Sequence, residues 1–360
     1  MLRRRAGTIA ESIVRRAPAG SVALIFAGGS LARGAVWACD VAGTLEVYSD
    51  IDLYVVVEDP SFVAAVQAAA RRAIAEVEAG REPGVLFLRG VDVGVYTRED
   101  LRAQPVRPGT ADLGTNHLVL YGDPGRLPGM LPAPEEMDGV EALYLLENRA
   151  WDAWRPPRGD ASRERLRRVL SLKLDLDIAV AHMIVAGAGV ASITNPAPAL
   201  RAPATFAIDE DVRAAGVRAI DARCDPGALA DLEENGESPL QRVGRAWLAL
   251  APWPLDAPGA DAAALFAARC AQGRRLANAR QWVRTAGCAG VAKPRALLAV
   301  WRCSARSPRS VLRLHPLAQV LLRGDALEVH AANARRVTAA LGFGLGTLDE
   351  RVRAAHAAIS

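Results

Sequence analysis

The sequence predicts an α+β protein: a mixed β-sheet domain with helices, followed by a mainly α-helical domain. Up to about residue 130, short β-forming runs alternate with segments whose apolar residues recur at helical spacing. Beyond a stretch rich in proline and glycine, the long segments have helical spacing alone. We therefore expect two domains, at 1–130 and 131–360, and a length of 360 residues also favours two domains.

The strands expected in the first domain are short runs of apolar, β-branched or aromatic residues, and its helices repeat apolar residues every three or four positions. Thr97, with Asp100 three positions later, is expected to cap a short helix. The turn residues at 122–125 end the last strand. The expected strands lie at 21–27, 45–57, 85–96 and 117–121, and the other expected helices lie at 3–17, at 61–79 and directly after the glycines at 28 and 29.

The second domain is expected to contain helices joined by proline-rich linkers at 195–203 and 252–258. Its most apolar run, at 178–193, contains a histidine and two glycines and is shorter than the roughly 20 residues that cross a bilayer, so we expect no membrane span. The expected helices lie at 135–155, 161–188, 238–249, 261–286 and 326–341.

Composition and charge limit the kinds of substrate and the cellular compartment that we expect for this protein. A net charge of only +4 gives the chain little general attraction for polymeric nucleic acid and fits a small anionic substrate better. The five cysteines form no CxxC or Cys/His cluster, which argues against structural zinc and disulfides and favours the cytoplasm. The basic N-terminal segment is amphipathic, unlike a signal peptide. Abundant alanine and only two lysines among 44 basic residues are typical of a GC-rich bacterial genome.

Gly28, Gly29 and Ser30 stand where an expected strand turns into a helix. Such a turn brings backbone amides and a hydroxyl group to a helix N-terminus, where phosphate oxygens bind readily. Glycines at such turns are also common for steric reasons alone. This segment by itself leaves both interpretations open.

Asp50 and Asp52 interrupt a strongly β-forming run. Residues two positions apart on a strand point to the same face, so the two carboxylates should lie side by side. Two like charges on one face lower stability unless a positive group lies between them. Mg²⁺ or Mn²⁺, which prefer carboxylate and phosphate oxygens, would supply that charge. The alternative is a solvated face without a ligand.

Asp92 is flanked by valines on a second expected strand. Burying a lone carboxylate among valines is costly without a partner. If the two strands are neighbours, Asp92 completes a cluster that binds metal ions or acts as general base toward an incoming hydroxyl group. The alternative is a surface edge strand.

The order of these segments resembles the nucleotidyltransferase superfamily of polymerase beta, the aminoglycoside nucleotidyltransferases and the small bacterial minimal nucleotidyltransferases. The matching segments are GGSLARG at 28–34, SDIDLYVVV at 49–57, VDV at 91–93 and LYGDP at 120–124. The resemblance covers about residues 8–130 and implies a nucleotidyltransferase fold there. The spacing from Ser30 to Asp50 is longer than is usual in the family, and the extra residues at 39–46 are expected to form a hairpin or a longer connection.

The resemblance also implies a role for each acidic residue. Asp50, Asp52 and Asp92 would be the catalytic carboxylates and would bind Mg²⁺ or Mn²⁺. Asp92 would in addition activate the hydroxyl group of the acceptor. Metal ions bridging the phosphates would neutralise the charge of the leaving pyrophosphate.

The nucleotide side of the expected site consists of backbone and basic residues. The resemblance implies that Gly28, Gly29 and Ser30 hold the outer phosphates of a nucleoside triphosphate such as ATP. Arg33, near the start of the following helix, is either a further phosphate contact or a solvated side chain. Lys173 is either the lysine that approaches the triphosphate in related enzymes or an ordinary lysine on a helix surface.

The resemblance implies an enzyme that transfers a nucleoside monophosphate from a nucleoside triphosphate to a hydroxyl group of a small molecule, such as an antibiotic or a natural-product intermediate. Two alternatives stay open: a toxin-antitoxin-type enzyme that modifies a protein or an RNA end, and an inactive nucleotide-binding regulator. The nucleotide and the acceptor stay unassigned, and a homodimer is one arrangement considered.

A helix expected at 135–155 carries polar and aromatic residues for which two interpretations stay open. They either line an acceptor pocket or, as is more common for tryptophans at this spacing, belong to the core or a domain interface. His117 and His182, which have no second ligand at a suitable spacing, are expected to be structural. The residues of the helix are Glu147, Asn148, Arg149, Trp151 and Trp154.

Overall fold

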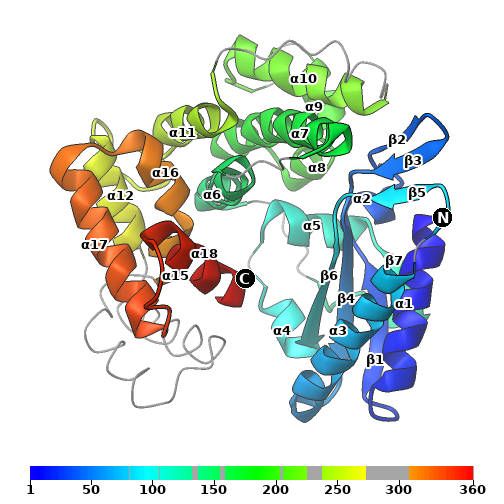
Figure 1. The fold of residues 1–360 in the computed structure, drawn as a ribbon. Coiled ribbons are helices and arrows are strands. Elements are labelled where there is room, and N and C mark those ends of the chain that lie inside the picture. The colour runs from blue at the N-terminus through cyan, green and yellow to red at the C-terminus, as the bar shows by residue number, and fades with distance from the viewer. Residues whose placement is uncertain are drawn as a thin grey trace. The chain divides into compact units, whose positions relative to one another are not determined.

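The chain forms two compact units (Figure 1). The first unit comprises Met1–Glu141 and Pro157–Leu232, and the second comprises Ala142–Pro156 and Glu233–Ser360. The computed structural model describes residues 1–80, 82–104, 106–131, 137–154, 159–202, 206–224, 237–272 and 308–359. The fold is mixed α/β, and a sheet followed by helices confirms the predicted order. This division differs from the single boundary expected near residue 131, because the chain leaves the first unit at 141 and returns to it at 157.

The main sheet of the first unit is mixed. β4 runs parallel to β6 and antiparallel to β1, and β1 runs antiparallel to β7. The central strands β1 and β4 are largely buried, which explains why both consist mainly of apolar residues. β6 lies at an edge of the sheet. Across the sheet, the strands are β6 (Val91–Thr97), β4 (Ile51–Val57), β1 (Val22–Ala27) and β7 (Leu118–Gly122).

One face of the main sheet is covered by α1 (Leu2–Arg16) and α3 (Val63–Ala79) (Figure 1). Leu53 and Val55 of β4 point toward these helices and belong to the same buried cluster as Ile9 of α1. The valines of β6 pack against this cluster as well. This layer contains the larger part of the apolar core of the sheet.

The opposite face is covered by α4 (Arg98–Arg102) and α5 (Pro108–Thr115). Phe26 of β1 and Val56 of β4 are buried on this side. Because successive residues of a strand point to opposite faces, Asp52 shares this face with Val56. The acidic residue of β4 therefore points away from the large apolar core.

A second, smaller sheet is formed by β2 (Ala38–Val41), β3 (Thr44–Val47) and β5 (Val85–Phe87) in that order. β2 and β3 are an antiparallel hairpin, and both turn residues, Ala42 and Gly43, have positive φ angles, of 51° and 81°. Two-residue hairpin turns of this kind match the twist of the strands. The hairpin is one of the two arrangements expected for the extra residues at 39–46.

The strands predicted at 45–57 and 85–96 are each two strands, which corrects the prediction. β3 and β5 pair in parallel in the small sheet, and β4 and β6 pair in parallel in the main sheet. Residues 48–50 and 88–90 carry the chain from one sheet to the other. The two segments pair with each other first in the small sheet and then in the main sheet, so both are interrupted where the chain passes between the sheets.

The short elements agree with the sequence prediction. The glycines lead directly into α2 (Gly29–Ala32). Thr97 and Asp100 form the expected capping box at the start of α4. Two 3₁₀ turns, η1 (Pro60–Phe62) and η2 (Pro124–Arg126), precede α3 and follow β7.

The first unit also contains helices from beyond residue 157. α7 and α10 pack on each other and against Tyr48 and Leu88, which lie in the connections between the two sheets. α10 was not predicted, because its buried face consists of alanines such as Ala219 rather than large apolar residues. The expected linker at 195–203 contains a short helix. These helices are α7 (Ala161–Val185), α8 (Val190–Thr194), α9 (Pro196–Arg201) and α10 (Glu210–Cys224).

The described part of the second unit is helical. The helix expected at 261–286 ends at residue 271, and 273–286 lie outside the described residues, as do the ends of the helix expected at 135–155. α15, α16 and α18 were not predicted. No described helix combines the length and the apolar character that a membrane span requires. The helices are α6 (Val140–Trp154), α11 (Pro239–Leu250), α12 (Ala262–Ala271), α15 (Pro308–Arg313), α16 (His315–Leu321), α17 (Gly324–Ala340) and α18 (Leu348–Ile359).

Candidate active site

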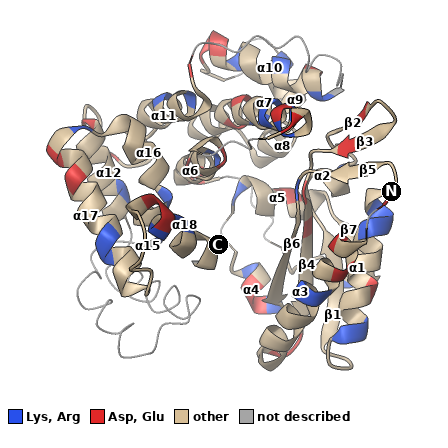
Figure 2. Cartoon of the chain, viewed as in Figure 1, with Lys and Arg blue, Asp and Glu red and all other residues tan. Residues whose placement is uncertain are grey.

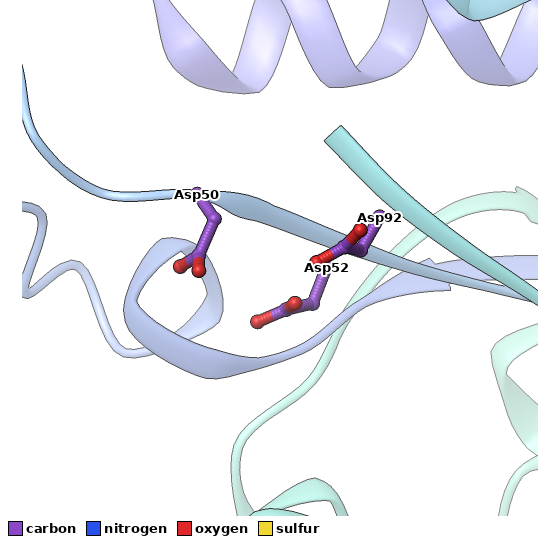
Figure 3. Close-up of side chains that lie close together, drawn as sticks. All are labelled: Asp50, Asp52 and Asp92. Carbon is purple, nitrogen blue, oxygen red and sulfur yellow. The ribbon is translucent and has the colours of Figure 1, made fainter. Parts of the chain in front are cut away.

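The parallel pairing of β4 with β6 brings the three predicted aspartates together. The register places Asp52 directly opposite Asp92, and Asp50 lies one residue before β4. One carboxylate oxygen from each residue lies within 4.8 Å of the other two (Figure 3). The prediction from spacing, that Asp50 and Asp52 lie side by side and Asp92 joins them from a neighbouring strand, agrees with this geometry.

Asp92 is exposed and is not buried among the valines that flank it. Val91, Val93 and Val95 pack toward the α1 and α3 layer, whereas Asp92 lies on the other face of β6. β6 is also an edge strand. Asp92 is therefore both a member of the acidic cluster and a residue of a surface edge strand, the two alternatives considered for it. The edge position leaves its carboxylate open to solvent on one side and close to Asp52 on the other.

The donor set of this cluster fits a divalent cation. Three carboxylates offer only oxygen ligands, the type that Mg²⁺ and Mn²⁺ prefer. Their spacing lets one ion, or two adjacent ions, contact oxygens of more than one residue. Within the described residues, no other group of three or more histidine, cysteine or acidic side chains has this proximity.

The cluster is electrostatically strained without a cation. The pKa of Asp52 is raised to about 6, mainly by burial and also by the negative charges of Asp50 and Asp92, while Lys173 and Arg89 act in the opposite direction. A divalent ion would replace this mutual repulsion by attraction. The arrangement is therefore suited to a cation.

Arg89 is a site residue that the sequence interpretation did not single out. Its Nη2 donates a hydrogen bond to Oδ2 of Asp50 at 2.9 Å, and both side chains are partly buried. Arg89 precedes β6, so only the parallel pairing of β6 with β4 brings it near Asp50. The signal that would have found it is its position three residues before Asp92.

The glycine turn lies against the same aspartates. The amide of Gly28 donates a hydrogen bond to the backbone oxygen of Asp52 at 3.1 Å. Gly29 has a φ of +61°, and a Cβ atom there would lie 2.7 Å from Oδ2 of Asp52. A side chain at position 29 would therefore be strained and would collide with the carboxylate. The glycine is required for close approach of the α2 backbone to the acidic cluster.

Ser30 and Arg33 lie on and directly after α2. The Oγ atom of Ser30 is buried and has no hydrogen-bond partner among the described residues. An unsatisfied buried hydroxyl group is unusual, and a ligand oxygen would satisfy it. Arg33 forms an ion pair with the buried Asp112 of α5, which also accepts a hydrogen bond from Asn116 at 2.9 Å. Its assignment as a phosphate contact stays a prediction.

Lys173 of α7 lies within electrostatic reach of the cluster, since its positive charge lowers the pKa of Asp52. The described residues of the first unit therefore bring a basic residue from position 173 to acidic residues at 50–92. Of the two interpretations of Lys173, this position favours a role at the site.

The residues considered for an acceptor pocket lie on α6 in the second unit. Glu147 is completely buried and forms an ion pair with Arg269. Trp151 and Trp154 pack edge to face, with ring centroids 5.3 Å apart, and contact histidines of the same unit. These contacts favour the core interpretation for the tryptophans.

Neither histidine of the first unit belongs to a group of three or more potential metal ligands among the described residues. Nδ1 of His117 lies 3.0 Å from the backbone oxygen of Leu113, and burial lowers the pKa of His182. Both positions agree with the expected structural roles.

Comparisons with known proteins do not assign the chain to a family: no protein-family model matches it, and no curated protein is significantly similar to it.

Proposed function

We propose that the protein is a metal-dependent nucleotidyltransferase that transfers a nucleoside monophosphate from a nucleoside triphosphate to a hydroxyl group of a small molecule and releases pyrophosphate. The observation that carries the proposal is the acidic cluster of Asp50, Asp52 and Asp92, whose oxygens lie within 4.8 Å of one another. Its position beside the bare backbone of Gly29 supports a phosphate-bearing substrate.

In the proposed reaction, the three aspartates would hold Mg²⁺ or Mn²⁺, which stabilises the negative charge on the phosphate oxygens. The acceptor oxygen bonds to the α-phosphorus while the bond from that phosphorus to the bridging oxygen breaks. The hydroxyl proton passes to Asp92, the most exposed carboxylate of the cluster. Pyrophosphate leaves with the electron pair of the broken bond.

The outer phosphates would contact the backbone of Gly28 and Gly29 and the hydroxyl group of Ser30. Two observations support this assignment: the missing side chain at Gly29 and the unsatisfied Oγ of Ser30. Lys173 supplies a positive charge near the cluster, as its effect on the pKa of Asp52 indicates. A compact ammonium group suits a phosphate that carries several negative charges.

The charge distribution supports a small substrate over a polymeric nucleic acid. Both basic and acidic residues lie on the described helices of both units (Figure 2). Many arginines are held in ion pairs, such as Arg167 with Glu164 and Arg201 with Asp221. Arginines paired in this way contribute little to an electrostatic surface for a phosphate backbone.

The proposal is tested by incubating the protein with each of four α-³²P-labelled nucleoside triphosphates, Mg²⁺ or Mn²⁺, and a panel of hydroxylated small molecules. We expect label transfer to at least one acceptor and an equal amount of pyrophosphate. Label entering a protein or an RNA end instead would favour the toxin-antitoxin-type alternative. Metal-dependent nucleotide binding without any transfer would favour an inactive regulator.

Asp50→Asn and Asp52→Asn are the matched variants, since each removes a negatively charged ligand without changing the side-chain volume. Both should abolish transfer. Asp221→Asn, which changes an exposed aspartate of α10 in the same unit, is the control and should keep the wild-type rate. Near-normal transfer by either site variant would refute the metal assignment.

A further inference from the structure

We infer that Glu46 and Arg165 are positioning residues: their ion pair holds α7 against the β2–β3 hairpin and thereby sets the distance between Lys173 and Asp52. This inference rests on the proposed function for its catalytic meaning. It concerns a hairpin that the resemblance to nucleotidyltransferases does not account for and two residues that the sequence interpretation did not single out.

The pair is bidentate and buried on the glutamate side. Nε and Nη2 of Arg165 donate to Oε2 and Oε1 of Glu46 at 2.8 and 2.5 Å. Ser162 donates to Oε1 at 2.7 Å, and the hydroxyl group of Tyr48 donates to Oε2 at 2.6 Å. Glu46 is only 3% exposed, and the hydrogen bonds from Arg165 are the main reason that its pKa falls to about 2. The carboxylate is therefore charged and fully coordinated.

The hairpin side of the pair is directly connected to the acidic cluster. Glu46 is a residue of β3, and Asp50 follows four positions later in the chain. Between them, Tyr48 donates its backbone N–H to the oxygen of Trp37 at 2.9 Å, and Oγ of Ser49 accepts a hydrogen bond from the amide of Trp37 at 2.9 Å. These bonds fix the short connection, so a contact at Glu46 is held at a constant distance from the aspartates.

The helix side of the pair is connected to Lys173. Arg165 and Lys173 are eight residues apart on α7, which is about 12 Å along the axis of a helix. A continuous helix transmits a displacement at one end to the other. Fixing Arg165 therefore fixes the position of Lys173 along the helix axis and its rotation about that axis.

Apolar packing alone would define this position less sharply. Leu166, Val169 and Leu172 of α7 pack with Tyr48 and Leu88 of the strand connections in one buried cluster. Apolar contacts have no preferred direction, so they define the register of the helix less strictly than a hydrogen-bonded ion pair does. A bidentate guanidinium–carboxylate pair has one favourable geometry, so it selects one register of α7 on the hairpin.

The test is a double-mutant cycle on Mn²⁺ affinity, measured in the absence of nucleotide by the electron paramagnetic resonance signal of free Mn²⁺. The pair variant Glu46→Gln/Arg165→Gln leaves the net charge unchanged. Lys173→Met removes a positive charge near the metal ligands and should tighten Mn²⁺ binding by on the order of tenfold. The pair variant should tighten binding in the same direction, by about threefold or more, because Lys173 is no longer held near Asp52.

In the Lys173→Met background, the pair variant should cause no further change in Mn²⁺ affinity, because the charge that it repositions is absent. Glu164→Gln/Arg167→Gln is the matched control: it removes an ion pair of the same kind within α7, which does not reach the hairpin. It should leave Mn²⁺ affinity unchanged in both backgrounds. Wild-type Mn²⁺ affinity in a folded pair variant, or full additivity with Lys173→Met, would overturn the inference.

Circular dichroism and thermal unfolding report whether the pair variant is folded. If it is not, Arg165→Lys serves instead: it keeps the charge, loses the bidentate fork and should shift Mn²⁺ affinity in the same direction to a smaller extent. Nucleotide binding separates this inference from the proposed function. A wild-type protein that binds Mn²⁺ but no nucleotide would refute the proposed function, while the Mn²⁺ cycle would still decide the positioning role.

Discussion

Two groups of charged side chains, one in each unit, are arranged in opposite ways. In the first unit, three aspartates lie together, one of them exposed, and two basic residues from other elements compensate them only in part. In the second unit, Glu147 and Arg269 are 0% and 2% exposed and pair through two hydrogen bonds of 2.7 and 3.0 Å. The ring of Tyr144 lies 4.2 Å from Cζ of the same arginine.

This difference separates a binding site from a structural ion pair. The charge of Glu147 is neutralised by a permanent partner, so removing that partner costs folding energy. The aspartates of the first unit repel one another, and Lys173 and Arg89 offset this repulsion only in part, so a cation from outside the chain would relieve the rest. A cluster of like charges that lowers stability is therefore a better indication of function than a buried pair with perfect geometry.

The largest effect is expected on the transfer activity, from a substitution in the acidic cluster itself. Asp52→Asn should lower transfer by at least about a thousandfold, since it removes a metal ligand. It should leave the midpoint of thermal unfolding unchanged or raise it, because the variant also removes a partly buried charge that Asp50 and Asp92 repel. Label transfer measures the loss of activity, and differential scanning calorimetry measures the midpoint of thermal unfolding. A marked loss of stability would place Asp52 in the same category as Glu147.

Glu147→Gln should destabilise the second unit by about 3–5 kcal/mol, because it leaves Arg269 buried without its carboxylate. Urea denaturation, followed by tryptophan fluorescence, measures the loss. Glu147→Leu combined with Arg269→Met should recover most of the stability, since an apolar pair of similar volume replaces both charges. Equal stability of wild type and Glu147→Gln would contradict the structural assignment.

The second unit should also lose stability on acidification. Burial lowers the pKa of His315, of His330 to about 3 and of His356 to about 4. Between these values and about 6.5, the unfolded chain binds protons that the folded chain does not, so stability is full above about pH 6.5 and falls as the pH decreases. Each histidine contributes up to about 1.4 kcal/mol per pH unit. Urea denaturation at several pH values from 7.5 to 5 measures the slope.

His330→Phe should make this pH dependence shallower, since the ring of His330 packs in the interior between Phe266 and His315 and a phenyl ring cannot take up a proton. The control is His117→Gln in the first unit, which should leave the slope unchanged. A slope that is the same with and without His330 would exclude it as a source of acid sensitivity.

The smallest effect is expected at Arg89. Arg89→Gln should change the stability of the first unit by no more than about 1 kcal/mol, because its pair with Asp50 is only partly buried. It should tighten Mn²⁺ binding severalfold, since a competing positive charge leaves Asp50. Isothermal titration with Mn²⁺ measures the shift. Weaker Mn²⁺ binding would mean that Arg89 orients Asp50 for the metal instead of competing with it.

The pairing of Asp50 with Asp52 could be predicted from the sequence because its geometry is local. Residues 50 and 52 share one face of a strand wherever that strand lies, and a lone aspartate among valines marks a second strand. The register that places Asp92 opposite Asp52 could not be predicted, because the segments that contain them each pair in two sheets. Arg89 was missed for the same reason.

The partners of Glu46 could not be predicted either, since nothing near position 46 or 165 indicates that the two residues meet. Their contact depends on the packing of α7 against the β2–β3 hairpin. The sequence predicted α7 as a helix, but the hairpin was only one of two arrangements expected for residues 39–46. α10 was missed because alanines give its buried face little apolar contrast. The periodicity of apolar residues in the sequence thus revealed neither long-range contacts nor a helix whose buried face consists of small residues.

The discontinuity of the first unit affects its synthesis. The ribosome makes the sheet first, then residues 142–156 of the other unit, and only afterwards the segment that begins at 157 and contains α7 and α10. Until that segment emerges, Tyr48 and Leu88 lack the apolar surface that covers them in the finished fold. The nascent connections between the two sheets therefore have an uncovered apolar surface for the time needed to translate some 100 further codons, an interval in which a chaperone could bind them.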